Sequence, residues 1–221
     1  MRPQTIKSNT LQKLICFCLL ALTPLLSSAQ TEKFIEGQHY SVIEQPLATS
    51  TGDNIEVKEL FWYGCPHCFR LEPDIIHWKN NMKADDAQFV LVPAVFSQRW
   101  EFHAKAFYTL DALGILDTAH QAIFDSIHVN KKHINNLKQL TKILVEQFGQ
   151  DEKKVESAFN SFSVDSNLRA ARSISQKSGA TGVPAIIVAG KYRTSVSEAQ
   201  GQKQLLEVIN FLVDKARTEK G

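Results

Sequence analysis

The chain has 221 residues, 43% of them hydrophobic, and its 25 Lys and Arg nearly balance its 23 Asp and Glu, for a formal net charge of +2. This length allows one large domain or two small ones. The charge balance gives no electrostatic support for binding to nucleic acid or to an acidic membrane surface, and no nucleic-acid partner is expected. The hydrophobic content is typical of a globular protein with a packed core.

The first 29 residues have the pattern of a secretory signal peptide. Arg2, Lys7 and Lys13 precede an apolar run from Leu14 to Leu26, and the small residues Ser27-Ser28-Ala29 follow. The run is short for a membrane span, which disfavours the alternative of an uncleaved anchor. We therefore expect cleavage after Ala29, which leaves residues 30–221 with 22 basic and 23 acidic residues.

Removal of this segment would leave a single pair of cysteines. Cys16 and Cys18 lie in the expected signal peptide, so Cys65 and Cys68 would be the only thiols of the exported chain. A disulfide between residues so close in sequence constrains little chain entropy and adds little stability. A redox or metal-binding pair is therefore favoured over a structural disulfide.

The first half of the exported chain predicts a strand–helix–strand unit. A short strand is expected within 40–43, and a second over 55–63 that runs directly into the cysteine pair. A helix is expected over 69–80 and a further strand over 88–96. Such a unit is normally parallel and right-handed, and chemistry tends to lie where its first strand meets the helix.

The second half changes character twice. From residue 97 to about 179 the apolar residues follow helical spacing, and nothing in this region predicts a strand. A hairpin is then expected over 185–193 and a final helix over about 199–216. The order of elements therefore predicts an α/β fold interrupted by an all-α insertion.

Together these motifs resemble those of the DsbA family of exported thiol:disulfide oxidoreductases. The tetrad Cys65-Pro66-His67-Cys68 follows the strand end Phe61-Trp62-Tyr63-Gly64, a helical insertion comes next, and Gly182-Val183-Pro184-Ala185 lies late in the chain. The resemblance implies a thioredoxin fold with an inserted all-α domain. Residues 30–97 and 172–221 would form the thioredoxin-like domain, and residues 98–171 the insertion.

Cys65 is the expected nucleophile, because a helix N-terminus stabilises a thiolate and lowers its pKa. Pro66 suits the first turn of that helix, where its missing N–H costs nothing. Cys68, one turn further on, would resolve the mixed disulfide with a substrate. His67 is expected to stabilise the Cys65 thiolate, with a solvated surface histidine as the alternative. No metal site is expected, because further ligands at suitable spacing are lacking in the sequence.

Two expected site residues lie away from the tetrad. The resemblance implies a cis peptide between Val183 and Pro184 beside the dithiol, where the Val183 backbone could pair with an extended substrate. It also implies a buried acid beneath Cys68, a position that Glu59 matches. The family often pairs this acid with a lysine on the neighbouring strand, but residues 88–96 contain no lysine. A solvated surface carboxylate is the alternative interpretation of Glu59.

The resulting hypothesis is a monomeric periplasmic dithiol oxidase without a cofactor. It would donate the Cys65–Cys68 disulfide to reduced, unfolded exported proteins and be reoxidised by a DsbB-like membrane quinone reductase. Two alternatives stay open at this point. One is an isomerase or reductase that uses the same thiols, and the other is a binding or chaperone domain with a vestigial disulfide.

Overall fold

The computed structural model describes residues 33–220, so the expected signal peptide, with Cys16 and Cys18, lies outside the described residues. The described chain contains a sheet in the order β1-β5-β4-β2-β3. The β2–β3 pair is parallel and the other neighbouring pairs are antiparallel. The strands are β1 (Ser41–Val42), β2 (Ile55–Phe61), β3 (Ala87–Pro93), β4 (Ala185–Val188) and β5 (Tyr192–Ser195).

Helices connect and cover these strands as the sequence predicts. They are α2 (Pro66–Asn81), α3 (Gln98–Ala112), α4 (Leu116–His128), α5 (Leu137–Phe148), α6 (Glu152–Phe159), α7 (Phe162–Lys177) and α8 (Gln202–Lys220). Four of them begin with a side chain that accepts a hydrogen bond from the first turn: Cys65 at α2, Asn136 at α5, Asp151 at α6 and Ser161 at α7. Gly149 ends α5 in the left-handed conformation, which favours glycine.

Strand β2 is an interior strand of the sheet. Its position between β3 and β4 leaves no edge free, and helices cover the sheet, so all seven residues are buried. Glu56 and Lys58 lie on one face of the strand, and both are buried. Their charges pair across 2.7 Å, which offsets the cost of removing them from water. Because β2 is fixed along its length, the loop that follows it has a well-defined starting point.

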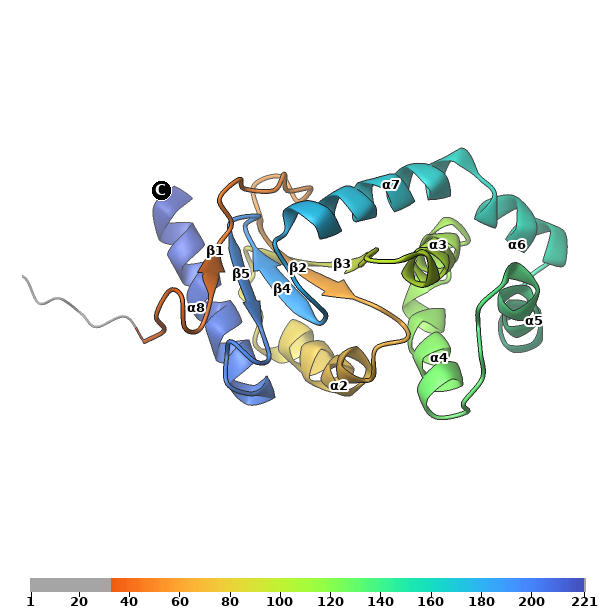
Figure 1. The fold of residues 1–221 in the computed structure, drawn as a ribbon, viewed down its shortest axis with the longest axis horizontal. Helices are drawn as coiled ribbons and strands as arrows, with labels where there is room; N and C mark the ends of the chain where they lie inside the picture. The colour runs from red at the N-terminus through yellow and green to blue at the C-terminus, as the bar shows by residue number, and fades with distance from the viewer. Residues whose placement is uncertain (1–32, 221) are drawn as a thin grey trace, which may run out of the picture. The chain divides into compact units, whose positions relative to one another are not determined.

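Helices α3 to α6 gather beyond the end of the sheet, and α7 leads the chain back to it (Figure 1). Helix α3 packs against α4, α6 and α7, and α5 packs against α6. Helix α7 runs across residue 171, where the expected insertion ends. The exact boundaries of the insertion stay a prediction, because the chain from Phe34 onwards forms one compact unit. Within residues 33–220, no helix is long and apolar enough to cross a membrane.

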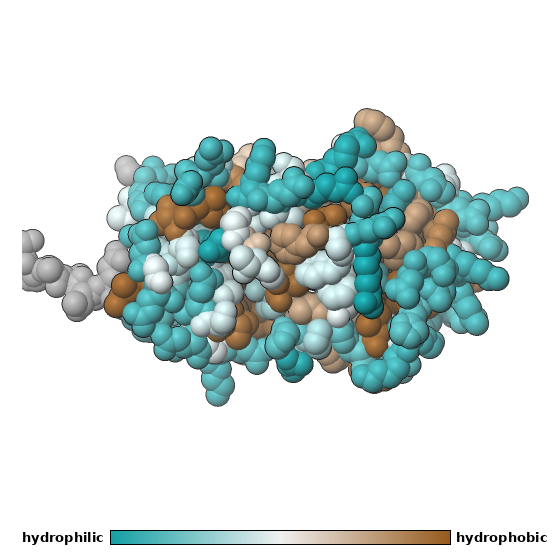
Figure 2. All heavy atoms as spheres, in the orientation of Figure 1, coloured by the Kyte–Doolittle hydropathy of each residue, from teal (hydrophilic) through white to brown (hydrophobic). Residues whose placement is uncertain are grey.

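The hydrophobic core has three parts, and one of them reaches the cysteines. The first lies between the sheet and helices α2 and α8, and another lies beside β3, β4 and α7. The remaining cluster joins Phe61 and Tyr63 to residues of α3, α4 and α5, and both Cys65 and Cys68 belong to it. In the view of Figure 2, hydrophilic residues cover most of the surface and hydrophobic residues show between them.

Candidate functional site

Cys65 occupies the N-cap position of helix α2. The Sγ atom of Cys65 accepts a hydrogen bond from the backbone N–H of Cys68 over 3.4 Å, as a capping side chain normally does. The helix begins at Pro66, whose fixed φ suits this position and which has no N–H to leave unpaired. Both cysteines are free thiols, and Cys65 is 6% and Cys68 1% exposed. The expected location of the dithiol at a strand-to-helix junction is thus what the structure shows.

The two thiols differ strongly in acidity. The pKa of Cys65 is lowered to about 6, chiefly by a hydrogen bond from the Cys68 thiol and against the opposing effect of burial. Backbone hydrogen bonds from Cys68 and His67 and the charge of His67 lower it further. Burial and the hydrogen bond to Cys65 raise the pKa of Cys68 well above that of an ordinary thiol. Cys65 is therefore suited to be a thiolate near neutral pH, and Cys68 to keep its proton.

The late proline motif forms the other wall of the site. The Val183–Pro184 peptide bond is cis, and the Cys65 thiol donates a hydrogen bond to the Val183 carbonyl over 3.4 Å. Residues 118 apart in sequence therefore meet at the nucleophilic sulfur. This agrees with the arrangement that the sequence motifs imply.

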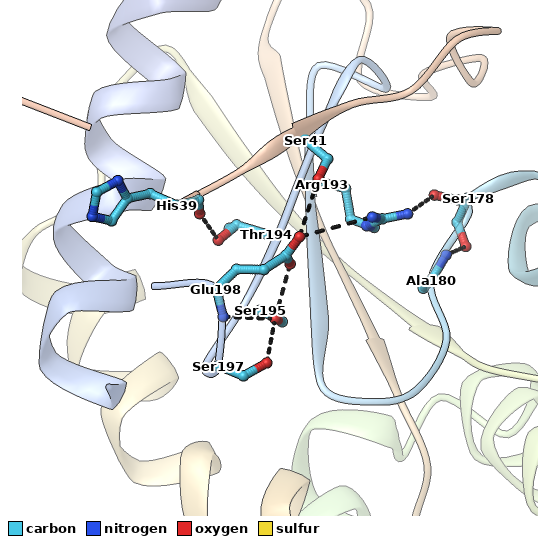
Figure 3. A network of polar contacts seen from close by, with 9 residues as sticks. All are labelled: His39, Ser41, Ser178, Ala180, Arg193, Thr194, Ser195, Ser197 and Glu198. Carbon is cyan, nitrogen blue, oxygen red and sulfur yellow. Dashed lines mark hydrogen bonds and ion pairs between the residues drawn. The ribbon is translucent and has the colours of Figure 1, made fainter. Parts of the chain in front are cut away.

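A pocket of about 540 Å³ opens beside this loop. His67, Val183 and Pro184 line one side of it, and residues of β5 and the following turn line the other. On that second side, the Glu198 carboxylate accepts hydrogen bonds from Ser41 and Ser195 and lies 3.8 Å from Arg193 (Figure 3). The pocket thus combines an apolar edge at the proline with a polar wall, and it is large enough for a side chain of a bound peptide.

His67 is exposed and points away from the core. Its Nδ1 lies 2.8 Å from the Arg70 guanidinium, which has only donors, so Nδ1 accepts this hydrogen bond. The backbone N–H and the charge of His67 both act on Cys65, and both lower its pKa. The exposed position is that of a solvated histidine, and stabilisation of the Cys65 thiolate by the imidazole stays a prediction.

Replacement of His67 with alanine is expected to raise the pKa of Cys65 modestly, by less than one pH unit. The side-chain charge is the smallest of the contributions that lower this pKa, and the backbone hydrogen bonds remain in the variant. Titration of the thiolate by its ultraviolet absorbance measures the change, with Cys65→Ser as the blank. A shift to the ordinary thiol range would mean that the imidazole, and not the helix N-terminus, controls the acidity.

Glu59 is buried, so the alternative of a solvated surface carboxylate is wrong. It is 1% exposed, and its neighbours across the sheet are Leu91 on β3 and Ile186 on β4. Burial, and next the negative charges of Glu72 and Cys65, raise its pKa well above the usual range. As the sequence predicts, no lysine faces it from β3. Lys58, the neighbour of Glu59 in β2, is paired with Glu56.

A second buried acid, Glu72, is not among the residues expected from the sequence, and it is 7% exposed. Glu72 lies four residues after Cys68 on helix α2, and this spacing places the two on one face of the helix. Its Oε1 lies 3.6 Å from Nε2 of His120 on α4. His120 is buried, and its Nδ1 lies 2.9 Å from the Tyr63 hydroxyl. The i to i+4 spacing from the cysteine is the signal that could have identified Glu72.

Aromatic residues near the dithiol mainly pack against one another. Trp62 stacks on Trp100 with ring centroids 4.5 Å apart, and Phe96 contacts the edge of Trp100. Phe96 is 40% exposed, whereas Trp62 and Phe102 are partly buried in the cluster that contains the cysteines. A Cβ at Gly64 would come within 2.3 Å of the Trp62 ring, which explains the glycine before Cys65. Only Phe96 of this group is well exposed to a substrate.

The family of the chain follows from comparison with known proteins. The model of the DSBA-like thioredoxin domain matches residues 56–210, which span the dithiol, the helical region and the cis-proline loop. The chain belongs to this family. Across residues 33–220, no group of three or more His, Cys, Asp and Glu side chains is placed to hold a metal ion.

Curated members of the DsbA family match nearly the whole chain. The thiol:disulfide interchange protein DsbA of Pseudomonas aeruginosa is 34% identical over 208 residues, which cover 94% of this chain and 98% of the relative. The protein of the same name from Azotobacter vinelandii is 34% identical over 214 residues, covering 94% and 99%. As a member of this family, the chain is a thiol:disulfide oxidoreductase.

Solved DsbA structures share the fold. The crystal structure of Pseudomonas aeruginosa DsbA superimposes with a TM-score of 0.80 at 34% identity, covering 86% of this chain and 98% of that one. The oxidoreductase NmDsbA1 of Neisseria meningitidis gives a TM-score of 0.73 at 30% identity, covering 84% and 95%. These matches confirm a thioredoxin-like DsbA fold with inserted helices.

Proposed function

We propose that the chain is an exported dithiol oxidase that introduces disulfide bonds into folding proteins through Cys65 and Cys68. The observation that carries this proposal is the position of the Cys65 sulfur at the N-cap of α2, where it accepts a hydrogen bond from the Cys68 N–H and where the pKa of Cys65 is lowered to about 6. A stabilised thiolate favours the reduced form, and a protein that favours its reduced form is a strong oxidant when its disulfide is closed. DsbA is the standard example of this relation between a low thiol pKa and a strongly oxidising disulfide. The geometry around Cys65 is what this chain adds to it.

The exchange has two steps. A substrate thiolate attacks Sγ of Cys65, the Cys65–Cys68 bond breaks, and Cys68 leaves as a thiolate that takes up a proton. Glu59 is the proposed proton donor, since burial favours its neutral form and its charge is felt at Cys68. A second substrate thiolate then attacks the substrate sulfur of the mixed disulfide and releases Cys65 as a thiolate. The substrate loses two electrons and the dithiol gains them.

The cis-proline loop and the pocket beside it are the proposed substrate-binding surface. The Val183 carbonyl already lies beside the reacting sulfur, and Pro184 has no N–H to compete for hydrogen bonds. An extended substrate segment could pair with the backbone at Val183 and place one side chain in the pocket. Main-chain pairing of this kind tolerates many sequences, as a general oxidase needs.

The cellular setting is also a proposal. The expected signal peptide over residues 1–29 supports export to the periplasm, where disulfides persist. There the oxidase would act on reduced, unfolded exported proteins. Each turnover leaves the dithiol reduced, so an oxidant must restore it, and we propose a DsbB-like membrane quinone reductase. We propose that the enzyme works as a monomer.

Oxidation of reduced, unfolded ribonuclease tests the function. The oxidised chain, as residues 30–221, is expected to transfer its disulfide in stoichiometric amounts and to turn over when a small disulfide oxidant is supplied. Loss of ribonuclease thiols and the matching gain of thiols on the enzyme are the measurements. If scrambled ribonuclease is rescued faster than the reduced protein is oxidised, the chain is an isomerase. If neither occurs, the proposed oxidase function fails.

A further inference from the structure

Tyr63, two residues before the reacting cysteine, is held at both of its polar ends by histidines of helix α4. Its hydroxyl lies 2.9 Å from Nδ1 of His120, and its backbone carbonyl lies 2.8 Å from Nε2 of His128. Tyr63 is 1% exposed, so water does not replace these partners. The exchange steps above use neither histidine.

One face of α4 carries these contacts. His120, Phe124 and His128 follow one another at a spacing of four residues, which places them on the same side of the helix. The Phe124 ring meets the Tyr63 ring edge-on with centroids 5.1 Å apart, and the His128 ring stacks on Phe69 at 4.9 Å. This face of α4 therefore contacts the chain both before and after the dithiol.

His128 acts as a hydrogen-bond donor in its contact with Tyr63. A carbonyl oxygen is an acceptor only, so Nε2 carries a proton and donates this hydrogen bond. The stacking on Phe69, with 15° between the ring planes, fixes the plane of the imidazole and with it the direction of the N–H. The bond therefore specifies where the Tyr63 carbonyl points.

The Tyr63 carbonyl belongs to the central peptide of a tight turn. Residues 63 and 64 form this turn, and the Cys65 N–H closes it with a hydrogen bond of 2.9 Å to the Trp62 carbonyl. The central peptide of such a turn has two orientations, which distinguish type I from type II, and type II requires a positive φ at the third residue. Gly64 occupies that position and is not among the described glycines with a positive φ, so the turn is not of type II. Glycine adopts a positive φ without strain, so Gly64 itself does not exclude the other orientation.

We propose that His128 is a positioning residue that holds the Tyr63–Gly64 peptide in one orientation and thereby sets the place of the reacting sulfur. Because the turn ends on Cys65, a flip of its central peptide would move the start of α2 relative to the cis-proline loop. The inference rests on the proposed function, in which Cys65 is the reacting thiol.

The contacts of the Cys65 sulfur show why its place matters. The sulfur accepts a hydrogen bond from the Cys68 N–H and donates one to the Val183 carbonyl, each over 3.4 Å. Both contacts depend on where the turn leaves Cys65. The first stabilises the thiolate, and the second joins the thiol to the loop that is the proposed substrate-binding surface. A turn held in one orientation therefore serves both the acidity of the thiol and its approach to a substrate.

The sequence permits a direct measurement on this one peptide. Gly64 is the only glycine that follows a tyrosine, so carbon-13 in tyrosine carbonyls and nitrogen-15 in glycines give a single carbonyl-to-amide correlation. In the reduced wild-type protein we expect one sharp peak. His128→Phe keeps a ring on Phe69 but removes the N–H, so the peak is expected to shift and to broaden or split as the peptide exchanges between two orientations. His128→Gln retains an N–H donor and is expected to restore most of the wild-type peak.

The acidity of Cys65 separates a positioning role from a merely structural one. His128→Phe is expected to raise the titration midpoint of the Cys65 thiol, measured by ultraviolet absorbance, by about 0.5 pH unit, a roughly threefold change in the ratio of thiolate to thiol. Because the thiolate stabilises the reduced form, the equilibrium with glutathione should shift by a similar factor towards the enzyme disulfide. His128→Gln should restore both values.

His103→Phe is the matched control. His103 is a buried histidine of α3 whose Nε2 lies 2.9 Å from the Ile134 carbonyl, so this variant also takes a ring N–H from a backbone carbonyl but leaves the Tyr63 carbonyl untouched. Its peak, thiol midpoint and glutathione equilibrium should match those of the wild type. Equal changes in His103→Phe and His128→Phe would mean a general loosening of the helical region and would overturn the inference. A shifted peak in His128→Phe with an unchanged thiol midpoint would overturn it as well.

The wild-type protein provides a further test if His128→Phe does not fold. Nitrogen-15 shifts of the imidazole distinguish the two neutral tautomers, and neutral His128 must carry its proton on Nε2. A proton on Nδ1 would contradict the inference. The ribonuclease assay is independent of these measurements. If the wild-type chain transfers no disulfide, the proposed function fails; if it transfers normally and His128→Phe changes neither the peak nor the midpoint, the function stands and only the inference fails.

Discussion

Replacement of Cys65 with serine is expected to abolish disulfide transfer. Replacement of Cys68 with serine is expected to stop the exchange at the mixed disulfide on Cys65. Cys65 carries the thiolate at the start of α2 and contacts the Val183 carbonyl, so no other thiol in the described chain can take its place. A covalent nucleophile of this kind has no partial substitute, and we expect a loss of at least about a thousandfold. The measurement is the transfer of a disulfide to reduced ribonuclease.

The Cys68→Ser variant gives the complementary result. Its Cys65 thiolate should still react with a mixed-disulfide donor, but no second thiol is available to release the product. We therefore expect a stable Cys65 adduct, visible as a mass increase that a reductant removes. Both variants should keep the wild-type fold by circular dichroism. An adduct on Cys68 in the Cys65→Ser variant would contradict the assignment of the two roles.

Above about pH 6, the free energy of unfolding is expected to be larger for the reduced form of the protein than for the oxidised form. The pKa of Cys65 in the folded protein is about 6, whereas a thiol in an unfolded chain titrates near about 8.5. Between these values the unfolded state binds more protons than the native state, so stability rises with pH. The gain is on the order of 2–3 kcal/mol after allowance for solvent screening.

The contribution follows directly from this depressed pKa. It is complete above the unfolded-state value, declines as the pH falls, and is lost below about 6. Denaturant unfolding of both redox forms between pH 5 and 8.5 measures it, and the difference between the forms cancels groups that titrate alike in both. Cys68 keeps its proton over this range, because burial raises its pKa. A difference that stays constant with pH would contradict the assignment of the thiolate to Cys65.

The parts of the fold that the sequence predicts are those with a local cause. Strand β2 and helix α2 lie where apolar alternation and helical spacing predict them, and Pro66 marks the helix start. The insertion is visible as a long region of helical spacing between two regions of strands. The cis peptide before Pro184 could not come from the local sequence, since most X–Pro bonds are trans, and only the family resemblance predicted it.

The parts that the sequence did not predict depend on contacts between distant elements. Burial of Lys58 is decided by the position of β2 between two strands and by its pairing with Glu56, and neither shows in the alternation of the strand. The contact of Glu72 with His120 joins two helices, and the two residues are 48 positions apart in the sequence. Burial of Glu59 is likewise a property of the assembled sheet. Sequence spacing could place each residue on a face, but it could not say what covers that face.

The contact between the Cys65 sulfur and the Val183 carbonyl spans 118 positions of the chain. Strand β4 starts directly after Pro184 and pairs with β2, so this contact exists only once the last part of the sheet has formed. During synthesis the thiol is present long before that strand. Full assembly of the redox site therefore comes late in folding, and a chain that stops short of β4 has both thiols without the Val183 carbonyl that lies beside Cys65 in the complete fold.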